Sequence, residues 1–548
     1  MHSSRNTDRQ ITARQSGRMC WMICALAVTL SCLLWDTLRG QQPGNQPVSL
    51  ISQYLSRQEK STDAKDTGTI QQPEEPLDRW QGSSLGFTLI GFAPGHFMVE
   101  KVRSGLAASV AGLQAEDKLL EVGPVDLLTQ SKSDLKSYLE QLAPNSTIKV
   151  VVKRQVESNG KQVEKRIDLR LVTDSKAMLD GWIVADRLQN NRIIRQSLDE
   201  RKQLEKLENL SENILRDIKK AATPRQAYER LNHRIDELGV SHTAIIPAWG
   251  YQRLTNQAKG GIGLTLQRQT RAGKSQYFVI DMEPGGPAHT SVMTIGDQVL
   301  SVNEIALEKS ARLILAGEEQ HQQLFMIASE KDETLQLAIR KKEKGPTQTV
   351  LLKTDINLSA NSASKSSLRV IKHDGKKFGY YRIWNLMSMK VDAYLSRAIE
   401  EEFKDCDGLI IDMRGRGGSI PVVQRIEKTI LGAELPVVGI IDKHSRSAKE
   451  ILAIRLKGND NVLLLGQRTC GAVTAATFAK LPSGNALMFP VSSGQRLSRY
   501  TRNINLEGKG VAPDIEVQFD LPFIGGKDPL LAAGKNQLLK MLGPDTEN

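Results

Sequence analysis

The sequence predicts a multidomain protein with two small β domains, a helical segment and a mainly parallel α/β domain. Three observations lead to this prediction: the length, an internal repeat, and strands that alternate with helices in the last third of the chain. At 548 residues the chain is too long for one hydrophobic core, because single domains usually hold roughly 50–200 residues. Its 40% apolar and 25% charged residues are ordinary for a globular protein.

Charge and cysteine content exclude several functional classes. The formal charge of +12 is spread over many lysines and arginines, without a basic block interleaved with aromatic residues. This pattern indicates a solvated surface rather than a nucleic-acid interface. Outside the N-terminal segment only Cys406 and Cys470 remain, too few and too far apart for a disulfide scaffold or a metal site. We expect no metal, cofactor or nucleic-acid partner.

The N-terminus is predicted to direct export. Within residues 1–40, Arg5, Arg9, Arg14 and Arg18 precede the uncharged apolar run Met19–Trp35. A basic start followed by an apolar run is typical of a signal peptide. The run is long for a signal peptide and lacks a clear cleavage site, so an uncleaved membrane anchor fits equally. Residues 41–83, rich in Gln, Ser, Asp, Glu and Pro, are predicted to form a flexible linker. We therefore expect a periplasmic or cell-envelope location.

A repeat occupies residues 84–173 and 258–355. Its two best-matching pieces are Leu85–Leu89 with Ile262–Leu266, and Ser104–Val122 with Pro284–Val302. Each copy reads as a glycine loop, a short strand, a helix of small residues, an acidic turn and another strand. This order resembles PDZ domains. The resemblance implies that Gly261, Ile262, Gly263 and Leu264 hold the C-terminal carboxylate of a peptide that adds a strand to the sheet edge. Peptide binding by the first copy stays open, since such a module also serves for packing or gating.

Residues 180–257 are predicted to be mainly helical, with apolar residues at three- and four-residue steps. The last long helix of this segment carries clear start and stop signals. These are Thr223, Pro224, Gln226 and Gly239. Directly after the stop comes Ser241-His242-Thr243.

Residues 365–535 alternate strands and helices, which predicts a largely parallel, right-handed α/β sheet. Predicted strands lie near 379–383, 407–413, 435–441, 461–465 and 486–489. The strand Leu435–Ile441, the turn Ser445–Glu450 and the helix Ile451–Leu456 form a strand–turn–helix unit. Such a unit holds a side chain at a helix N-terminus, where backbone N–H groups are free. Residues 536–548 are assigned to a C-terminal tail.

Residues 408–516 resemble the C-terminal-processing (tail-specific) serine peptidases, a family that includes the tricorn core protease and the vertebrate retinoid-binding repeats. The matching segments are Gly408–Gly418, Ser445–Glu450, Gly466–Gly471, Leu481–Ala486 and Glu507–Asp514. A PDZ domain between an N-terminal helical part and the core is also this family's layout. The resemblance implies a peptidase core of crotonase/ClpP-like type.

The resemblance implies that Ser447 is the nucleophile, three residues before Glu450. Ser445 is the competing serine, and a helix-capping role for Ser447 is the alternative without chemistry. In the lysine-dependent branch of the family, a lysine lies 25 residues after the serine and a glutamine supports it. The counts give Ala472 and Ala476 here, so the chain is not a Ser-Lys enzyme by that route.

The tricorn-like branch instead uses a Ser-His pair and a glutamate, which implies His242 as general base, Ser241 to orient it and Glu507 to support the array. His242 as an ordinary loop histidine, and His444 as the base, remain open. The oxyanion donors are expected to be the N–H groups of Gly417 or Gly418 and of Ala448, with a plain glycine turn as the alternative.

The sequence therefore favours an exported serine endopeptidase that recognises protein C-termini through a PDZ domain. Unfolded or tagged proteins would be its substrates, and the membrane a further partner if the N-terminal segment stays uncleaved. A catalytically silent scaffold of the same fold is the main alternative, favoured by the missing lysine. A small-ligand carrier like the retinoid-binding repeats has no positive support. Oligomeric state is left open.

Overall fold

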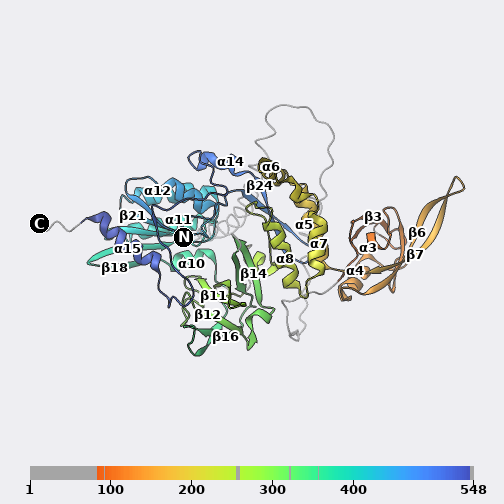
Figure 1. The fold of residues 1–548 in the computed structure, drawn as a ribbon, viewed down its shortest axis with the longest axis horizontal. Coiled ribbons are helices and arrows are strands. Elements are labelled where there is room, and N and C mark those ends of the chain that lie inside the picture. Colours follow the sequence, from red (N-terminus) through yellow and green to blue (C-terminus); the bar gives the residue numbers. More distant parts are fainter. Residues whose placement is uncertain (1–82, 92, 255–259, 320–321, 356, 544–548) are drawn as a thin grey trace, which may run out of the picture. The chain divides into compact units, whose positions relative to one another are not determined.

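The computed structural model describes residues 83–91, 93–254, 260–319, 322–355 and 357–543 (Figure 1). The predicted signal or anchor (1–40) and nearly all of the predicted linker (41–83) lie outside the described residues. Within the described residues, no helix is long and apolar enough to cross a membrane.

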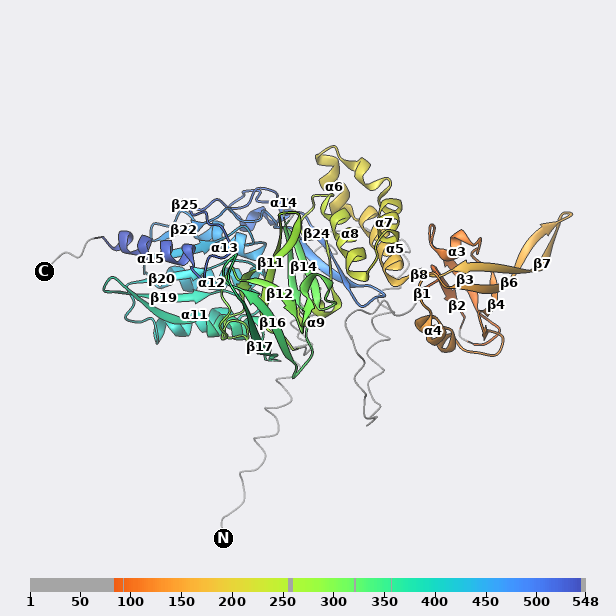
Figure 2. The same ribbon diagram turned by 60° about the horizontal axis from the view of Figure 1, so that its bottom comes forward.

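The first repeat is an antiparallel sheet in the order β2-β3-β4-β6-β7, with β5 paired to β4 (Figure 2). Its elements are β2 (Phe87–Ile90), β3 (Met98–Val102), α3 (Ala107–Val110), β4 (Lys118–Val122), β5 (Val125–Asp126), α4 (Lys132–Gln141), β6 (Thr147–Ser158) and β7 (Lys161–Val172). Alternating apolar residues give the sheet a buried face. Leu119, Val150 and Val152 are completely buried in the core that α4 covers.

The second repeat has the sheet order β14-β15-β10-β11-β12-β16-β17, with β13 paired to β12. Its elements are β10 (Leu264–Arg271), β11 (Lys274–Met282), β12 (Gln298–Val302), β13 (Ile305–Ala306), the 3₁₀ turn η2 (Leu307–Lys309), β14 (Leu313–Glu319), β15 (Gln322–Ile327), β16 (Thr334–Arg340) and β17 (Thr347–Lys353). Phe325 and Tyr277 meet edge to face inside it.

The predicted helix of small residues forms in the first repeat as α3 but is absent from the second, so that prediction was wrong for the second copy. Between Gly286 and Ser291 the chain makes turns instead. The hydroxyls of Thr290 and Ser291 bond locally, to Gly286 O at 3.1 Å and to Ala288 O at 2.7 Å, and share these carbonyls with the backbone N–H groups of the same two residues. Such local bonds compete with helix formation.

Between the repeats lies the predicted helical segment. It consists of the strand β8 (Asp174–Ser175), which pairs with β1 (Ser83–Ser84), and then α5 (Lys176–Gln189), α6 (Arg192–Glu200), the 3₁₀ turn η1 (Leu204–Leu207), α7 (Leu210–Lys219), α8 (Pro224–Asp236), β9 (Ala244–Ile246) and α9 (Ala248–Leu254). The predicted start of α8 is confirmed: Thr223 accepts a hydrogen bond from the N–H of Gln226 at 3.2 Å, and Pro224 is the first helical residue.

The α/β domain is built on the sheet β18-β19-β20-β21-β22-β25, in which β19 to β25 run parallel and β18 antiparallel (Figures 1 and 2). Its strands are β18 (Arg369–His373), β19 (Lys376–Arg382), β20 (Gly408–Asp412), β21 (Val437–Ile441), β22 (Val462–Gly466) and β25 (Ile515–Glu516). Its helices are α10 (Ala360–Ser366), α11 (Lys390–Glu400), α12 (Ile420–Gly432), α13 (Ala448–Leu456) and α15 (Pro529–Leu542).

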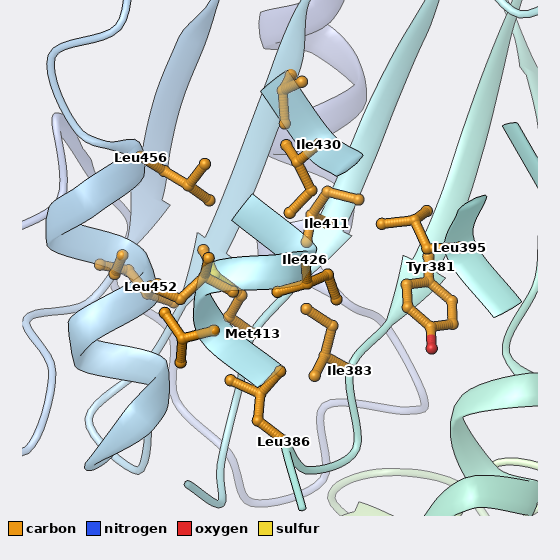
Figure 3. Packing of buried hydrophobic residues seen from close by; sticks show 14 of the residues in the cluster. Tyr381, Ile383, Leu386, Leu395, Ile411, Met413, Ile426, Ile430, Leu452 and Leu456 are labelled. Atoms are coloured by element: carbon orange, nitrogen blue, oxygen red, sulfur yellow. The ribbon is translucent and has the colours of Figure 1, made fainter. Parts of the chain in front are cut away.

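Both faces of this sheet are covered. Helices α11 to α13 share one buried apolar cluster with the sheet, part of which Figure 3 shows around Ile411, Met413 and Ile426. Helix α15 packs through Leu530 and Leu538 on the other side, against Val438 and Ile440. The strands are therefore apolar on both sides, as expected for a parallel sheet.

The strand predicted at 486–489 does not join the parallel sheet, which corrects that part of the sequence prediction. It is β24 (Ala486–Ser492), the middle strand of an antiparallel sheet β23-β24-β9, with β23 at Ala475–Lys480. The chain then continues through α14 (Gly494–Leu497) and the 3₁₀ turn η3 (Ser498–Tyr500). This sheet connects the segment after His242 to the segment after Thr474. The observed elements and sheets otherwise agree with the predicted fold class.

Candidate active site

Ser447 lies between the end of β21 and the start of α13, where it is the N-cap residue. Its φ of 55° is in the left-handed region, which residues other than glycine rarely adopt. The side chain is half-buried. A serine on such a turn presents its hydroxyl at the helix N-terminus, where unpaired N–H groups favour negative charge.

Two neighbours hold the backbone of Ser447. Its N–H donates to the carbonyl of Ala472 at 2.8 Å and to Glu450 Oε2 at 3.1 Å. Glu450 is completely buried and also accepts bonds from Thr469 Oγ1 and from the N–H groups of Gly471 and Ala472, at 2.6 to 2.8 Å. Burial raises the pKa of Glu450, and these bonds partly offset the rise. Glu450 thus fixes the Ser447 turn to the 469–472 segment.

The competing serine, Ser445, is completely buried. Its hydroxyl donates to Met413 O and to Asp442 Oδ1, both at 2.9 Å, and accepts the N–H of Asp442 at 3.0 Å. A hydroxyl engaged in this way supports the turn and offers no access to a substrate.

Gly417 lies directly against Ser447. A Cβ on Gly417 would come within 2.6 Å of Ser447 Cβ, so only glycine fits. Gly418 instead packs on Leu386, whose N–H donates to Gly417 O at 2.9 Å. Among the described residues, the N–H groups of Gly417, Gly418 and Ala448 donate to no other group. Gly417 and Ala448 therefore present free donors next to Ser447, as an oxyanion hole requires.

Ser241 and His242 form a second cluster with Thr474. Ser241 Oγ lies 2.6 Å from Thr474 Oγ1 and 3.2 Å from His242 Nδ1. Thr474 Oγ1 is also 3.3 Å from His242 Nδ1 and donates to Ser241 O at 3.2 Å. His242 has a φ of 57°, again in the left-handed region. A hydroxyl can donate to Nδ1 or accept from it; Nε2 is the basic nitrogen of the neutral imidazole when Nδ1 carries the proton and donates it to one of these oxygens.

Glu507 supports the same cluster through the backbone. Its Oε2 accepts the N–H groups of Val473 at 2.8 Å and of Thr474 at 3.1 Å. The carboxylate thus holds the main chain at Val473 and Thr474, just before β23. A supporting role of Glu507 in catalysis stays a prediction.

The segment 472–474 brings the two clusters together. Ala472 binds the backbone of Ser447, and Thr474 binds Ser241 and His242. Two residue steps of extended chain span only about 7 Å. A nucleophilic serine, a histidine oriented through Nδ1 and two free N–H donors are the components of an acyl-transfer site.

Lys449 is a buried group that the sequence prediction missed. Its side chain is completely buried, and Nζ donates to Arg414 O at 2.7 Å and to Trp384 O at 3.3 Å. Burial lowers the pKa of this lysine to about 7. The side chain ties α13 to the start of the glycine loop that contains Gly417.

Arg416 connects this glycine loop to the second repeat. Its guanidinium contacts Asp281 of β11 at 3.3 Å and Thr265 of β10 at 3.2 Å, and stacks on the Trp384 ring at 4.2 Å. Burial raises the pKa of Asp281, but Arg382 and Arg416 more than offset this, so its pKa lies below the ordinary value. The pair is therefore ionised at neutral pH.

The remaining predicted residues lie elsewhere. His444 is half-buried, and its N–H donates to Asp442 Oδ1 at 3.1 Å. In the predicted peptide loop, Ile262 O accepts the N–H of Ala288 and Gly263 O that of Glu283. Leu264 begins β10, which is paired with β11 on one side and β15 on the other. Peptide binding by Gly261, Ile262, Gly263 and Leu264 stays a prediction.

Sequence reasoning missed Thr474, Lys449 and the role of Glu450. Glu450 was available as the residue three positions after Ser447, where a carboxylate can bind the N-cap N–H. Thr474 belongs to no matching segment, and Lys449 lies within Ser445–Glu450 without an assigned role; only the fold gives both their contacts. In the described part of the chain, no group of three or more His, Cys, Asp or Glu residues could hold a metal ion.

Comparisons with known proteins agree with the two main parts of this architecture. The model of peptidase family S41 matches residues 424–517, and that of the PDZ domain matches residues 252–340. The "C-terminal processing peptidase, chloroplastic" of Tetradesmus obliquus is 23% identical over 291 residues, 47% of this chain and 60% of that protein. The "Carboxyl-terminal-processing protease" of Picosynechococcus sp. is 22% identical over 299 residues, 49% of this chain and 68% of that protein.

Among solved structures, the "Photosystem II D1 C-terminal processing protease" aligns with a TM-score of 0.39 at 18% identity, over 65% of this chain and 98% of that one. The tricorn protease aligns with a TM-score of 0.35 at 14% identity, over 73% of this chain and 41% of that one. The chain spans about 60% of the length of the first curated relative that it matches.

Proposed function

Because this chain is a PDZ-containing relative of the carboxyl-terminal-processing peptidases of family S41, we propose that it is a serine endopeptidase. Its substrates are unfolded or tagged proteins whose C-termini a PDZ-like domain holds. The observation that carries the proposal is the strained turn of Ser447, joined through Ala472 and Thr474 to a histidine that is oriented by two hydroxyls.

In the proposed reaction, Ser447 Oγ attacks the carbonyl carbon of the scissile peptide while His242 Nε2 accepts the hydroxyl proton. The negative charge that forms on the carbonyl oxygen is stabilised by the N–H groups of Gly417 and Ala448. The imidazolium then protonates the leaving amine as the C–N bond breaks, which leaves an acyl group on Ser447. A water molecule, deprotonated by His242, cleaves this ester and regenerates the serine.

Ser241 and Thr474 orient the imidazole in this mechanism. In the proposed mechanism Nδ1 keeps its proton and donates it to the hydroxyl oxygen of Ser241 or Thr474, which leaves Nε2 as the basic nitrogen. Glu507 acts one step further away, because it binds the N–H groups of Val473 and Thr474. The second function considered, a catalytically silent scaffold, is favoured by Ala472, which stands where the lysine-dependent branch of the family has its base.

Replacement of Ser447 tests the proposal. Ser447→Ala is expected to abolish casein cleavage and labelling by a fluorophosphonate, since no other activated hydroxyl is available. Its melting temperature should stay close to that of the wild type, because the half-buried hydroxyl contributes little to packing.

Ser445→Ala is the matched control, two residues away. It should lower the melting temperature, since it removes the bonds to Met413 and Asp442, while the folded fraction keeps its fluorophosphonate label on Ser447. Labelling of the Ser447→Ala protein would show that another residue is the nucleophile. A wild-type protein that takes no label and cleaves no casein would instead support the silent scaffold.

We further propose that the chain is exported, with Met19–Trp35 as signal or anchor. One of the two curated relatives named above is a chloroplastic protein. Alkaline carbonate extraction of membranes and mass spectrometry of the mature N-terminus distinguish the two forms. A protein that stays in the cytosol with its N-terminus intact would contradict export.

A further inference from the structure

The two repeats are built on the same backbone frame. In both, matched hydrogen bonds join the glycine loop, the second strand of the repeat and the turns around it, and a bulge interrupts the first strand pair at the same place. The matched bonds are Ala108 N to Leu85 O with Ala288 N to Ile262 O, Arg103 N to Gly86 O with Glu283 N to Gly263 O, and Val99 N to Asp117 O with Val279 N to Asp297 O; the bulges follow Thr88 and Thr265. Strand β2 therefore corresponds to β10.

The repeats differ in the segment before the last strand pair. In the first repeat, α4 connects β5 to β6. In the second, the hairpin β14–β15 takes its place between β13 and β16. The same frame thus carries a helix in one copy and two additional strands in the other.

Strand β15 pairs with the edge of β10 that faces away from β11. The two strands run antiparallel, with Thr265 opposite Met326 and Gln267 opposite Leu324. Continuing this register by one residue brings the end of β15, Ile327, opposite Leu264 and next to the glycine loop. An extended segment of the chain itself therefore lies where a peptide would add to the sheet.

The hairpin is firmly attached to the rest of the molecule. Strand β14 lies beside α8 (Figure 1) and also contacts β9; these two elements flank His242 in the sequence. Directly after β15, the carbonyl of Ser329 accepts a hydrogen bond from Trp249 Nε1 at 2.9 Å, and before β14 the carbonyl of Ser310 accepts one from Arg225 at 3.2 Å. Withdrawal of β15 would break contacts with the segment that carries His242.

In the first repeat the corresponding edge is open. Among the described residues, β3 is the only strand paired with β2. Helix α4 runs along the other side: its first residue, Lys132, donates to Leu89 O at 3.4 Å, and the helix also contacts β1. Ile90 is 41% exposed. A strand edge beside a helix, with apolar residues on it, is suited to an added peptide strand.

We propose that the first repeat is the peptide-docking domain and that the second is permanently filled by its own strand β15. The occupant of the β2 edge is an extended apolar peptide that runs antiparallel to β2, as β15 does on β10. This direction places the last residue of the peptide opposite Phe87. Its free carboxylate then meets the buried Leu85–Gly86 loop, where Gly86 has a φ of 75° and its N–H donates to Ser84 Oγ at 3.3 Å, a long bond that the carboxylate would replace.

This inference rests on the proposed function and assigns its substrate-docking step to one domain. The second repeat then has a fixed structural role, since it contacts the glycine loop of the site through Arg416. The assignment reverses the expectation that Gly261–Leu264 hold the substrate.

The test uses the full chain with Ser447→Ala, so that the probe is not cleaved. The probe is the fluorescein-labelled hexapeptide Gln-Gln-Leu-Phe-Met-Ile, the sequence of β15, with a free C-terminal carboxylate. Fluorescence anisotropy measures its affinity, and hydrogen exchange by mass spectrometry locates the site. We expect slower exchange in residues 85–90 and no change in residues 263–267. The same peptide with a C-terminal amide should bind at least about tenfold more weakly, because one charged contact is worth about 1.4 kcal/mol or more.

A disulfide between β10 and β15 tests which of the two repeats binds the peptide. Gln267→Cys with Leu324→Cys joins residues that lie directly opposite each other on β10 and β15. The oxidised and reduced forms should bind the peptide equally. Loss of binding on oxidation, protection in residues 263–267, or unchanged exchange in residues 85–90 would each overturn the proposal. So would dimerisation of the chain without peptide, seen by sedimentation and accompanied by protection of β2. None of these readouts requires cleavage, so failure of the proposed peptidase activity would be seen separately, in the casein assay.

Discussion

Ser447 and His242 have a positive φ, 55° and 57°, without being glycine, as do thirteen other described residues. Ser447 also has a ψ of −123°, far from the usual left-handed region. Such a backbone costs on the order of 1–3 kcal/mol for each residue and persists only where its surroundings hold it. Two bonds to Ala472 and Glu450 hold Ser447, and the hydroxyls of Ser241 and Thr474 surround Nδ1 of His242. Strain at both members of a candidate pair is consistent with a functional rather than a capping role for Ser447.

If His242 is the general base, the pH dependence of cleavage should reveal it. Log(kcat/KM) should rise with pH as the imidazole loses its proton, because only the neutral imidazole accepts the proton of Ser447. His242→Gln should remove this rise and lower kcat/KM by about 10²- to 10⁴-fold. The measurement is the pH profile of kcat/KM for a fluorogenic peptide.

Two milder variants serve as controls. Ser241→Ala and Thr474→Val each remove one hydroxyl that contacts Nδ1. Both should lower kcat/KM less than His242→Gln does, and both should keep the rise of log(kcat/KM) with pH. If log(kcat/KM) of His242→Gln still rises with pH in the same way, the base is another group, and His444 is the next candidate to replace.

The individual residues show how much of the candidate site can be predicted from the amino-acid sequence alone. Ser447, His242 and Glu507 stand in recognisable motifs, so the motifs alone were enough to select them as candidates. Thr474 could not be selected in this way, because its hydrogen bond with Ser241 joins two positions that are 233 residues apart in the sequence. Glu450 lies between these cases: its spacing from Ser447 is visible, but its bonds to Thr469, Gly471 and Ala472 require the fold.

At the level of helices and strands, the sequence predicted those whose apolar pattern is local. The buried strands β20 and β21 and the capped helix α8 agree with it, since their signals are burial on both faces and the Thr223-Pro224 start. Strand β24 was assigned to the wrong sheet. Its apolar residues are equally suited to both sheets, and its place in the second sheet follows only from its antiparallel pairing with β9.

The glycine loop after β20 depends on an element that lies elsewhere in the sequence. Lys449 reaches from α13 to the carbonyls of Arg414 and Trp384. Lys449→Met should leave both carbonyls unpaired, which destabilises the fold by roughly 1–3 kcal/mol for each buried group. Activity should fall as well, since the loop carries Gly417.

The pH dependence of this loss is specific. The pKa of Lys449 is about 7 in the folded protein, whereas an unfolded lysine has a pKa near 10.4. Between these values the unfolded state binds more protons, so this group makes the free energy of unfolding rise with pH, by at most about 1.4 kcal/mol per pH unit. Lys449→Met should lack this contribution in urea unfolding at pH 7 and pH 9, whereas the exposed-lysine control Lys390→Met should retain it. Equal pH slopes for wild type and Lys449→Met would contradict a neutral buried lysine.

In the whole molecule, the second repeat is bound to the α/β domain at several places. Phe523 of the C-terminal segment meets Phe278 edge to face at 5.3 Å, and its N–H donates to Gly296 O at 2.9 Å. Asp281 binds Arg382 of β19 at 2.9 Å in addition to Arg416 of the glycine loop. These contacts explain why the sequence could suggest a PDZ-like domain but not its role: the motif defines the fold, while the filled edge and the arginine contacts arise from other parts of the chain.

The contact between Arg416 and Asp281 should couple the second repeat to the rate of cleavage. Arg416 precedes Gly417, so loss of its bonds to Asp281 and Thr265 frees the loop that presents the oxyanion donor. Arg416→Gln should lower kcat several-fold, because misplaced donors stabilise the transition state less. Its melting temperature should change little, since the guanidinium is partly exposed.

A double-mutant cycle with Asp281→Asn identifies the cause. Asp281→Asn also weakens the pair with Arg382, so it should reduce stability more than Arg416→Gln does. In kcat, however, the double variant should be no slower than the slower single variant, because both changes remove the same connection. The two effects should therefore differ from additivity by about 1 kcal/mol, a coupling typical of residues in contact. Strictly additive effects on kcat would show that Arg416 acts through Trp384 alone, and that the second repeat does not influence the loop through Asp281.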